Sequence, residues 1–430
     1  MAKFQNWSRI VTAHPSEIQT PRSVDDLVAA VNQARDEGKH IRMVGAGHSF
    51  TPTAATDGIM LSPANYRGVR KVDVENQLVT VDAGIDLTTL CEALQDHGLA
   101  LINMGDIRVQ TIAGAIQTGT HGTGRASGTF AAMVTELEIV LADGSVVTVN
   151  ENNDPELFNC ARVGLGTFGM ISAVTLKVDK QFRLTAHEFP ASLDECYDKF
   201  DQWTDEHDHV EFFWFPHTEG CHVKHNDRTQ NPPNPPGKFA AWWEEEFLSN
   251  KVFGWANKLG RAAPGYVPVL NKIATKALSD RTYTNESWRV FTSARDVRFA
   301  EMEYNLPRAS LLPALREVKA LLDRRGWRIS FPVEVRSIPG DDAWLSPANG
   351  RDSGYLAFHA FERTDREWFV EVEQILRSYD GRPHWGKLHT RTAADLAPAY
   401  PKWEAAMAVR DRVDPGRVFA NDYTDTVLGA

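Results

Sequence analysis

The sequence predicts an α+β protein built from two domains. At 430 residues the chain is longer than one hydrophobic core usually supports. Up to about residue 180 the sequence alternates between helical and strand-like patterns, and from there to about residue 330 it is richer in tryptophan, proline and isolated charges. An apolar content of 42% and a charged content of 24% are ordinary for a globular protein. The change in composition places a domain boundary near residue 180.

Charge and composition narrow the classes of partner. The 46 basic and 57 acidic residues give a net charge of −11, which argues against nucleic acid. No run approaches the roughly 18 consecutive apolar residues of a membrane span, and the first residues lack the apolar run of a secretory signal. The four cysteines form no Cys-x-x-Cys pair and no zinc-like spacing. We therefore expect reduced thiols, no metal site and a cytoplasmic protein.

Helix and strand signals alternate along the chain. Ser23 can cap a helix over 24–37, with Asp26 three residues on and apolar residues following at helical spacing. Further elements are expected as a strand at 41–44, a helix at 87–97, hairpins at 69–83 and 134–149, strands at 171–178, 212–215, 331–336 and 355–361, and a last helix near 405–413.

The stretch Gly45-Ala46-Gly47-His48-Ser49-Phe50 follows an apolar strand. Glycine lets the backbone approach a ligand closely, and consecutive N–H groups in such a turn form an anion-binding concavity. His48 could reach the same ligand. The alternative is a tight turn whose histidine satisfies a neighbouring carbonyl.

Two further glycine-rich stretches follow. Residues 111–124 are small and rich in threonine, which suits passage along a large polar ligand such as a nucleotide better than a packed helix; the alternative is a surface loop. Residues 164–169 match the Gly-x-Gly-x-x-Gly fingerprint, but Asp154-Pro155 opens a helix before them and a strand follows. The fingerprint needs the opposite order, so a Rossmann domain is excluded.

In this order and at this spacing, the stretches 45–50, 111–124 and 164–171 resemble the flavin-binding domain of the vanillyl-alcohol oxidase superfamily. Within it, the chain is similar to the sugar-1,4-lactone and alditol oxidases over nearly its whole length. The resemblance implies a vanillyl-alcohol oxidase-type fold, with an FAD-binding domain at 1–180, a substrate-binding cap domain with an antiparallel sheet at 181–390, and a C-terminal segment at 391–430 that returns to the FAD-binding domain.

The resemblance also implies which residues hold FAD. In many relatives the histidine equivalent to His48 is bonded to the 8α carbon of FAD, so a covalent flavin is expected here. The implied cofactor-binding residues are Gly45, Ala46, Gly47, His48, Ser49, Thr111, Ala113, Gly114, Thr118, Thr120, Gly122, Thr123, Ile171 and Asn421.

Candidate catalytic residues come from the second half. Strand alternation puts Glu334 and Arg336 on one face, either as a solvated ion pair or as a buried pair that binds a polyhydroxylated substrate. His359 is either a core histidine or a contact to a substrate hydroxyl, and Phe361 stands where the alditol oxidases carry threonine. Lys387, in His-Trp-Gly-Lys, is by default a surface lysine. The resembling enzymes place Glu334, Arg336, His359 and Lys387 at the active site.

These residues imply hydride transfer from a carbinol carbon of a sugar-1,4-lactone, such as L-gulono-1,4-lactone, to N5 of FAD. Electrons then pass to oxygen or another acceptor, and the product belongs to ascorbate biosynthesis. Two alternatives stay open. One is an alditol oxidase acting on the terminal hydroxyl of xylitol or sorbitol, and the other is a non-catalytic flavin- or sugar-binding protein.

Overall fold

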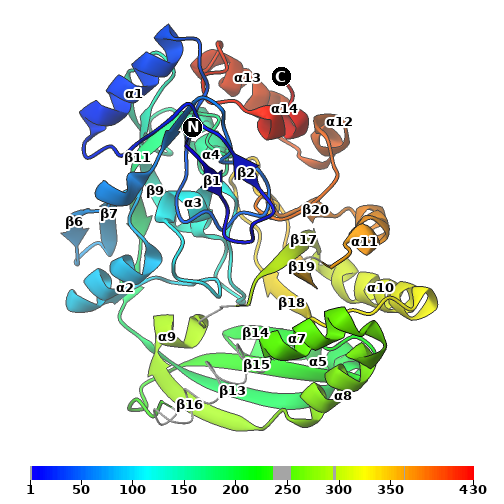
Figure 1. The fold of residues 1–430 in the computed structure, drawn as a ribbon. Coiled ribbons are helices and arrows are strands. Elements are labelled where there is room, and N and C mark those ends of the chain that lie inside the picture. The colour runs from blue at the N-terminus through cyan, green and yellow to red at the C-terminus, as the bar shows by residue number, and fades with distance from the viewer. Residues whose placement is uncertain (1, 236–252, 294–296, 363) are drawn as a thin grey trace.

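The computed structural model describes residues 2–235, 253–293, 297–362 and 364–430. One half contains the first 180 residues together with the C-terminal helices, and the other is built around a large antiparallel sheet (Figure 1). This arrangement confirms the predicted α+β class. The domain boundaries at 180 and 390 stay predictions.

The first half contains two main sheets. The antiparallel sheet has the order β10-β9-β11-β7-β6, with β6 Val69–Asp73, β7 Leu78–Asp82, β9 Val134–Val140, β10 Val146–Val149 and β11 Met170–Lys177. The parallel sheet has the order β3-β5-β4, with β3 Glu17–Gln19, β4 Ile41–Met43 and β5 Ile59–Leu61. Two short pairs join β1 Phe4–Gln5 to β2 Thr12–Ala13 and β8 Leu99–Ala100 to β12 Asp179–Lys180. Both predicted hairpins are confirmed.

Each of the four α-helices described within the first 180 residues begins after a polar residue whose side chain accepts a hydrogen bond from a backbone N–H of the first turn. They are α1 Val24–Asp36, α2 Leu87–Asp96, α3 Ile112–Gln117 and α4 Pro155–Ala161. The Ser23 side chain accepts a hydrogen bond from the Asp26 N–H, which confirms the predicted start of α1. The glycines of 164–169 lie between α4 and β11, so their order is helix, turn, strand, as the sequence predicts.

The helix α3 corrects one expectation. Residues 111–124 were expected to avoid a packed helix, yet Thr111 caps a short helix by accepting from the Gly114 N–H. Its small side chains let it lie tightly against the sheet, with Ile112 and Ile116 fully buried. Small residues therefore allow close packing here, where the sequence argument took them to prevent it.

The second half is an eight-stranded sheet of order β16-β13-β15-β14-β18-β19-β17-β20, and every neighbouring pair is antiparallel. Its strands are β13 Arg183–Ser192, β14 His209–Trp214, β15 Gly220–Thr229, β16 Arg281–Glu286, β17 Phe299–Pro307, β18 Val333–Ile338, β19 Ser353–Phe361 and β20 Arg382–Pro383. In this register Arg336 lies opposite Glu211, and Glu334 opposite Ala357.

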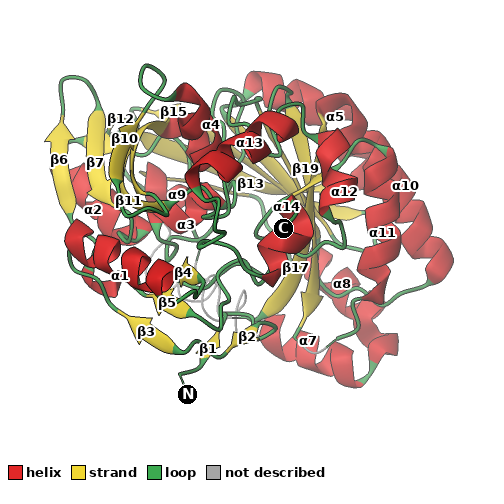
Figure 2. Cartoon of the chain, turned by 90° about the horizontal axis from the view of Figure 1, so that it is seen from above, coloured by secondary structure: helices red, strands yellow, loops and turns green. Residues whose placement is uncertain are grey.

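The two faces of this sheet differ in chemistry. Val333 and Val335 join an apolar core under α5 Leu193–Glu206, α10 Leu311–Arg325 and α11 Glu367–Ser378, which lie along the outer side of the molecule (Figure 2). Because side chains alternate along a strand, Glu334 and Arg336 lie on the other face. That face therefore carries the candidate catalytic pair. The remaining helices of this half are α7 Phe253–Ala262, α8 Val267–Lys276 and α9 Ser287–Phe291.

The C-terminal segment packs against the first half. Its helices are α12 Ala393–Leu396, α13 Trp403–Val413 and α14 Asp422–Leu428. The Ile41 N–H donates to the Val418 carbonyl at 2.9 Å, and Phe419 is buried in a core cluster with residues of α1. In Figure 1 the last helices accordingly lie beside the start of the chain. Searching the described residues for a helix able to cross a membrane finds none.

Candidate active site

The first cavity lies where the three glycine-rich stretches meet, and its empty space, including the part open to solvent, is about 1000 Å³. Its walls come from β4 and the loop after it, from α3, and from the turn before β11. Ten of the residues predicted to hold the cofactor line it, namely Gly45, Ala46, Gly47, His48, Ser49, Thr111, Ala113, Gly114, Thr118 and Ile171. Segments more than a hundred residues apart in sequence thus converge on one site.

The loop at the centre of this cavity presents a row of hydrogen-bond donors. The N–H groups of the five residues from Gly45 to Ser49 find no acceptor among the described residues. The flanks are fixed, because the Val44 N–H donates to the Leu61 carbonyl at 2.9 Å and the Phe50 N–H to the Gly386 carbonyl at 2.7 Å. Gly47 has a φ of 67°, which glycine adopts without strain. The row is therefore available to an anionic ligand.

Arg42 connects the segments that form this cavity, and it is not among the residues predicted from the sequence. Its guanidinium donates to four carbonyls in three segments of the chain, those of Thr53, of Leu165 and Gly166, and of Phe419. Burial lowers the pKa of Arg42 to about 10, with a smaller contribution from the charge of Arg410. An arginine inside a buried strand was the sequence signal that could have revealed it.

Three of the predicted cofactor residues do not line the first cavity but support it. Asn421 caps α14, and its amide donates to the carbonyls of residues 52, 53 and 55, a loop that lines the cavity. The Thr123 hydroxyl donates to the Val210 carbonyl at 2.5 Å, which links this half to β14. Gly122 lies against the backbone of Met104. Their contacts make them positioning residues.

A second cavity of about 790 Å³ adjoins the first. Both are lined by His48, Ser49, Gln110 and Thr118, so they meet at the histidine loop. Thr120 and the predicted catalytic residues Glu334, Arg336 and Lys387 line only the second cavity. A ligand in the first cavity and a small molecule in the second would therefore face each other beside His48.

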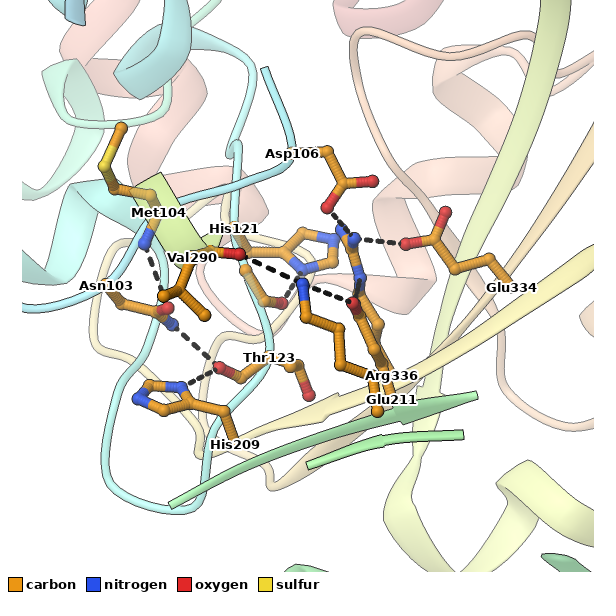
Figure 3. Close-up of polar contacts among 12 residues, drawn as sticks. Asn103, Met104, Asp106, His121, Thr123, His209, Glu211, Val290, Glu334 and Arg336 are labelled. Carbon is orange, nitrogen blue, oxygen red and sulfur yellow. Dashed lines mark hydrogen bonds and ion pairs between the residues drawn. The ribbon is translucent and has the colours of Figure 1, made fainter. Parts of the chain in front are cut away.

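Arg336 is held by three carboxylates. Its Nε donates to Glu211 Oε2 at 2.8 Å, and its Nη2 contacts both Asp106 and Glu334 (Figure 3). Although burial would lower the pKa of Arg336, these carboxylates hold it well above the ordinary value. Glu334 and Arg336 are 5% and 7% exposed, which rules out the solvated ion pair. Arg336 is thus a fixed positive charge at the cavity wall.

Lys387 supplies the second positive charge. Its ammonium contacts Glu301 and lies 3.9 Å from Glu303, both on β17. Burial would raise the pKa of each carboxyl group, but Lys387 holds the pKa of Glu301 below its ordinary value. His121 does the same for the pKa of Glu303. Glu301 and Glu303 were missed by the sequence argument. Their spacing of two on a strand is the signal that also marks Glu334 and Arg336.

The structure puts His359 behind the cavity wall. It does not line either cavity; its Nε2 lies 3.5 Å from Glu301, and its ring packs between Phe299 and Phe331. His359 is thus placed to support Glu301, and its expected contact to a substrate hydroxyl stays a prediction. His384, the first residue of the His-Trp-Gly-Lys motif, lines the second cavity.

Within the described residues, two groups of side chains have the spacing of metal ligands, and members of both already form hydrogen bonds or ion pairs. His121 Nε2 is bonded to Glu303 at 3.1 Å in the first group, which His384 completes. The second group comprises Asp106, Glu211 and Glu334, which enclose the Arg336 guanidinium. That guanidinium already provides the positive charge that a metal would bring.

His48 is neutral at physiological pH. Burial, and secondarily the charge of Lys387, lower its pKa to about 4. A neutral imidazole keeps a lone pair on one ring nitrogen, so it can act as a nucleophile or as a hydrogen-bond acceptor. His48 can therefore react with a ligand at the junction of the two cavities.

Comparison with known proteins identifies two family matches. The D-arabinono-1,4-lactone oxidase family matches residues 174–427, and an FAD-binding domain family matches residues 15–150. Together they cover both halves of the site.

Individual relatives agree with these matches. The chain is 40% identical to L-gulono-1,4-lactone dehydrogenase from Mycobacterium tuberculosis, with 99% of each chain aligned. It is 34% identical to L-gulonolactone oxidase from Bos taurus over 99% of this chain and 98% of that protein, and 27% identical to alditol oxidase from a Streptomyces species over 98% of each.

Among solved structures, the fold is similar to that of cholesterol oxidase from B. sterolicum, with a TM-score of 0.84 and 21% identity. The match covers 99% of this chain and 96% of the other. At this identity the likeness concerns the fold, and it agrees with the predicted vanillyl-alcohol oxidase type.

Proposed function

Because this chain belongs to the D-arabinono-1,4-lactone oxidase family, we propose that it oxidises a sugar-1,4-lactone of the L-gulono-1,4-lactone type with FAD. The observation that carries the proposal is the meeting of two cavities at His48. One offers a row of unengaged peptide N–H groups, and the other holds Arg336 and Lys387.

The first cavity fits FAD. Five consecutive N–H groups can donate hydrogen bonds to the pyrophosphate. The buried guanidinium of Arg42 donates to backbone carbonyls and so keeps the surrounding segments in place. When bound, FAD supplies the hydride acceptor at N5 and passes the electrons to oxygen or another acceptor.

The second cavity binds and polarises the lactone. Arg336 and Lys387 hydrogen-bond the oxygen of the carbinol that is oxidised and stabilise the negative charge that develops there, while the hydroxyl proton passes to a carboxylate that lines the same cavity. Glu334 accepts hydrogen bonds from neighbouring hydroxyls. Because Asp106, Glu211 and Glu301 fix the two cations, little reorganisation is needed when the charge appears.

We assign the covalent attachment of FAD to His48. Its neutral ring lies at the junction of the cavities, where a flavin that spans them would pass. The bond would fix the flavin against the lactone and raise its reduction potential.

A ring substrate is favoured over an open-chain polyol. Phe361, which takes the place of the threonine expected in alditol oxidases, is buried in a cluster with Phe50, Phe299 and Phe331. Phe50 and Phe299 line the second cavity, so this side of it is apolar and aromatic. It offers no hydroxyl to the far end of a polyol. The alditol oxidase reading remains the second candidate, since that relative aligns along the whole chain.

Oxidation at C2 of the lactone gives a 2-keto-lactone that tautomerises to an enediol of the ascorbate type, so we place the reaction in ascorbate biosynthesis. The free and buried cysteines, Cys91, Cys160, Cys196 and Cys221, support a reducing compartment such as the cytoplasm.

The test compares substrates under identical anaerobic conditions. The rate of flavin reduction is measured with L-gulono-1,4-lactone, D-arabinono-1,4-lactone and xylitol. We expect at least about a tenfold preference for a lactone. A preference for xylitol would favour the alditol oxidase, and no reduction by any lactone or polyol would leave a non-catalytic binding protein. Repeating the turnover with oxygen and with a dye as acceptor distinguishes an oxidase from a dehydrogenase.

A further inference from the structure

One surface of the second half is unusually apolar for an exposed region. The four most exposed large hydrophobic side chains of the described residues are Trp255, Tyr266, Val269 and Ile273, which are 54% to 66% exposed. All four belong to α7, α8 and the short connection between them. In Figure 1 α8 lies at the lower border of the molecule, and in Figure 2 α7 lies at the lower border. A patch of this kind marks an interaction site.

The sequence of these helices is basic. Residues 253–279 contain four basic residues and no Asp or Glu, in a chain whose net charge is −11. The basic side chains are all exposed, and they are Lys258, Arg261, Lys272 and Lys276. We call the eight exposed residues named in these two paragraphs the α7–α8 face.

Helical spacing puts the two kinds of side chain together. On α8, Lys272, Ile273 and Lys276 come three, four and seven residues after Val269, so all four lie on one face of the helix. On α7, Trp255 and Lys258 are three apart. Apolar and basic groups therefore share the outer surface of each helix.

The opposite faces hold the helices in place. The Asn271 amide donates to the carbonyls of Pro216 and Ile329 at 2.9 and 3.0 Å, and Asn257 accepts from the Ser330 hydroxyl at 2.5 Å. Val267 is buried. The inner contacts anchor α7 and α8, so the outer residues are free to serve another purpose.

We propose that the α7–α8 face docks on the surface of an anionic lipid bilayer. Trp and Tyr are enriched at the boundary between lipid and water, and a helix with basic and aromatic residues on its outer face lies in that boundary. Basic groups add attraction to anionic headgroups. Lysine is depleted in protein interfaces, so this composition favours a membrane over a protein partner. This inference does not depend on which substrate is oxidised.

Docking in this way would hold the active site near the membrane. Arg261 at the end of α7 donates to the Glu362 carbonyl at 3.2 Å, and its guanidinium lies 5.6 Å from the ring of Phe361. Phe361 belongs to the aromatic cluster with Phe50 and Phe299, which line the second cavity. The aromatic cluster that contains Phe361 therefore lies between Arg261 of the α7–α8 face and the substrate cavity.

The experiment is flotation of the full-length, FAD-loaded protein with lipid vesicles. Vesicles of phosphatidylcholine alone are compared with vesicles that contain about one third phosphatidylglycerol. We expect binding to the anionic vesicles, little binding to the neutral ones, and weaker binding as salt is raised. No preference for anionic vesicles would overturn the proposal.

Variants of the α7–α8 face separate the contribution of its basic residues to vesicle binding from that of its apolar residues. Lys272→Glu/Lys276→Glu should weaken binding by at least about tenfold, since each basic group near an anionic surface contributes about fivefold. Trp255→Ser/Ile273→Ser should weaken binding to a similar degree and leave the salt dependence unchanged. All these side chains are exposed, so the melting temperature and the flavin absorbance should stay as in the wild type.

Matched controls make the same changes elsewhere. Arg67→Glu/Lys180→Glu changes the charge equally at exposed positions in the first half, and Val74→Ser/Val146→Ser removes exposed apolar groups there. Both controls should bind as the wild type does. Equal weakening by a control would refute a localised face. A dimeric wild type that becomes monomeric in Trp255→Ser/Ile273→Ser, without vesicle binding, would assign the face to a second copy of the chain instead.

Discussion

The indole of Trp7 stacks on the imidazole of His48, with ring centroids 5.1 Å apart and planes inclined by 23°. The backbone N–H of Trp7 donates to the Gly47 carbonyl at 2.8 Å. Phe299 of β17, in the other half of the molecule, packs on the Trp7 indole. The N-terminal segment thus fixes the orientation of the ring that we assign to covalent attachment.

Removing this stack should lower the fraction of covalent flavin. In Trp7→Ala the His48 ring gains rotational freedom, so we expect FAD to bind but a substantial part of it to be released by acid. The measurement is flavin fluorescence in the acid-denatured pellet. His48→Ala should leave none in the pellet, and Trp255→Ala, an exposed tryptophan far along the chain, should retain all of it. Complete release of flavin from the wild type would contradict the covalent bond.

Replacing Lys387 by methionine should lower kcat/KM by about 10²- to 10³-fold, because a preorganised positive charge at the developing oxyanion is lost. The same change leaves Glu301 buried with only His359 beside it, so the pKa of Glu301 should rise and the protein should become less stable. Steady-state kinetics and thermal melts measure the two effects separately.

The double variant Lys387→Met/Glu301→Gln is the control for the electrostatic argument. Without the carboxylate there is no unpaired buried charge, so much of the lost stability should return while kcat/KM stays low. Recovery of activity together with stability would mean that Lys387 acts only through folding.

Arg42→Lys should reduce both stability and retention of FAD before covalent attachment. A lysine keeps the positive charge but cannot donate to these four carbonyls, which belong to three segments, at once. We expect a loss of about 2–4 kcal/mol in the free energy of unfolding, from carbonyl groups left without donors. Urea unfolding of the FAD-free protein measures this loss in the free energy of unfolding. Unchanged stability would show that these hydrogen bonds are not needed.

Buried histidines should make the protein less stable in mild acid. Burial lowers the pKa of His384 to about 3 and that of His389 to about 4, from an ordinary value of 6.5. Above pH 6.5 neither state binds the proton. Below it, the unfolded chain takes up protons that the folded protein refuses, so stability falls with decreasing pH by up to about 1.4 kcal/mol per pH unit for each histidine.

Melting temperatures between pH 7 and pH 5 test this prediction, since the carboxyl groups contribute mainly below that window. His384→Asn keeps an acceptor for the Gly386 N–H, which donates to His384 Nδ1 at 3.0 Å, and it should flatten the pH dependence. His389→Asn should do the same independently. Parallel curves for wild type and both variants would contradict the assignment of neutral histidines.

The sequence was most informative where local chemistry determines structure. The Ser23 cap, the helix before 164–169 and the alternation around Glu334 depend on neighbouring residues, and these predictions agree with the structure. The α3 helix was misjudged, because whether small residues pack or stay open depends on the sheet that they meet.

The site residues that were not predicted from the sequence share one feature. Arg42, Glu301 and Glu303 gain their roles only through partners far away in sequence, such as the Phe419 carbonyl, Lys387 and His121. The packing of His359 between Phe299 and Phe331, with its Nε2 beside Glu301, likewise depends on residues distant in the sequence. No periodicity in the sequence encodes such distant pairings.

The most direct test of lactone oxidation is the visible flavin absorbance of the purified protein after anaerobic addition of L-gulono-1,4-lactone. Our account predicts rapid bleaching in the wild type, bleaching slowed by orders of magnitude in Lys387→Met, and recovery of the colour when an electron acceptor is admitted. Flavin that stays oxidised with every sugar-1,4-lactone, in protein shown to be folded and loaded with FAD, would contradict it.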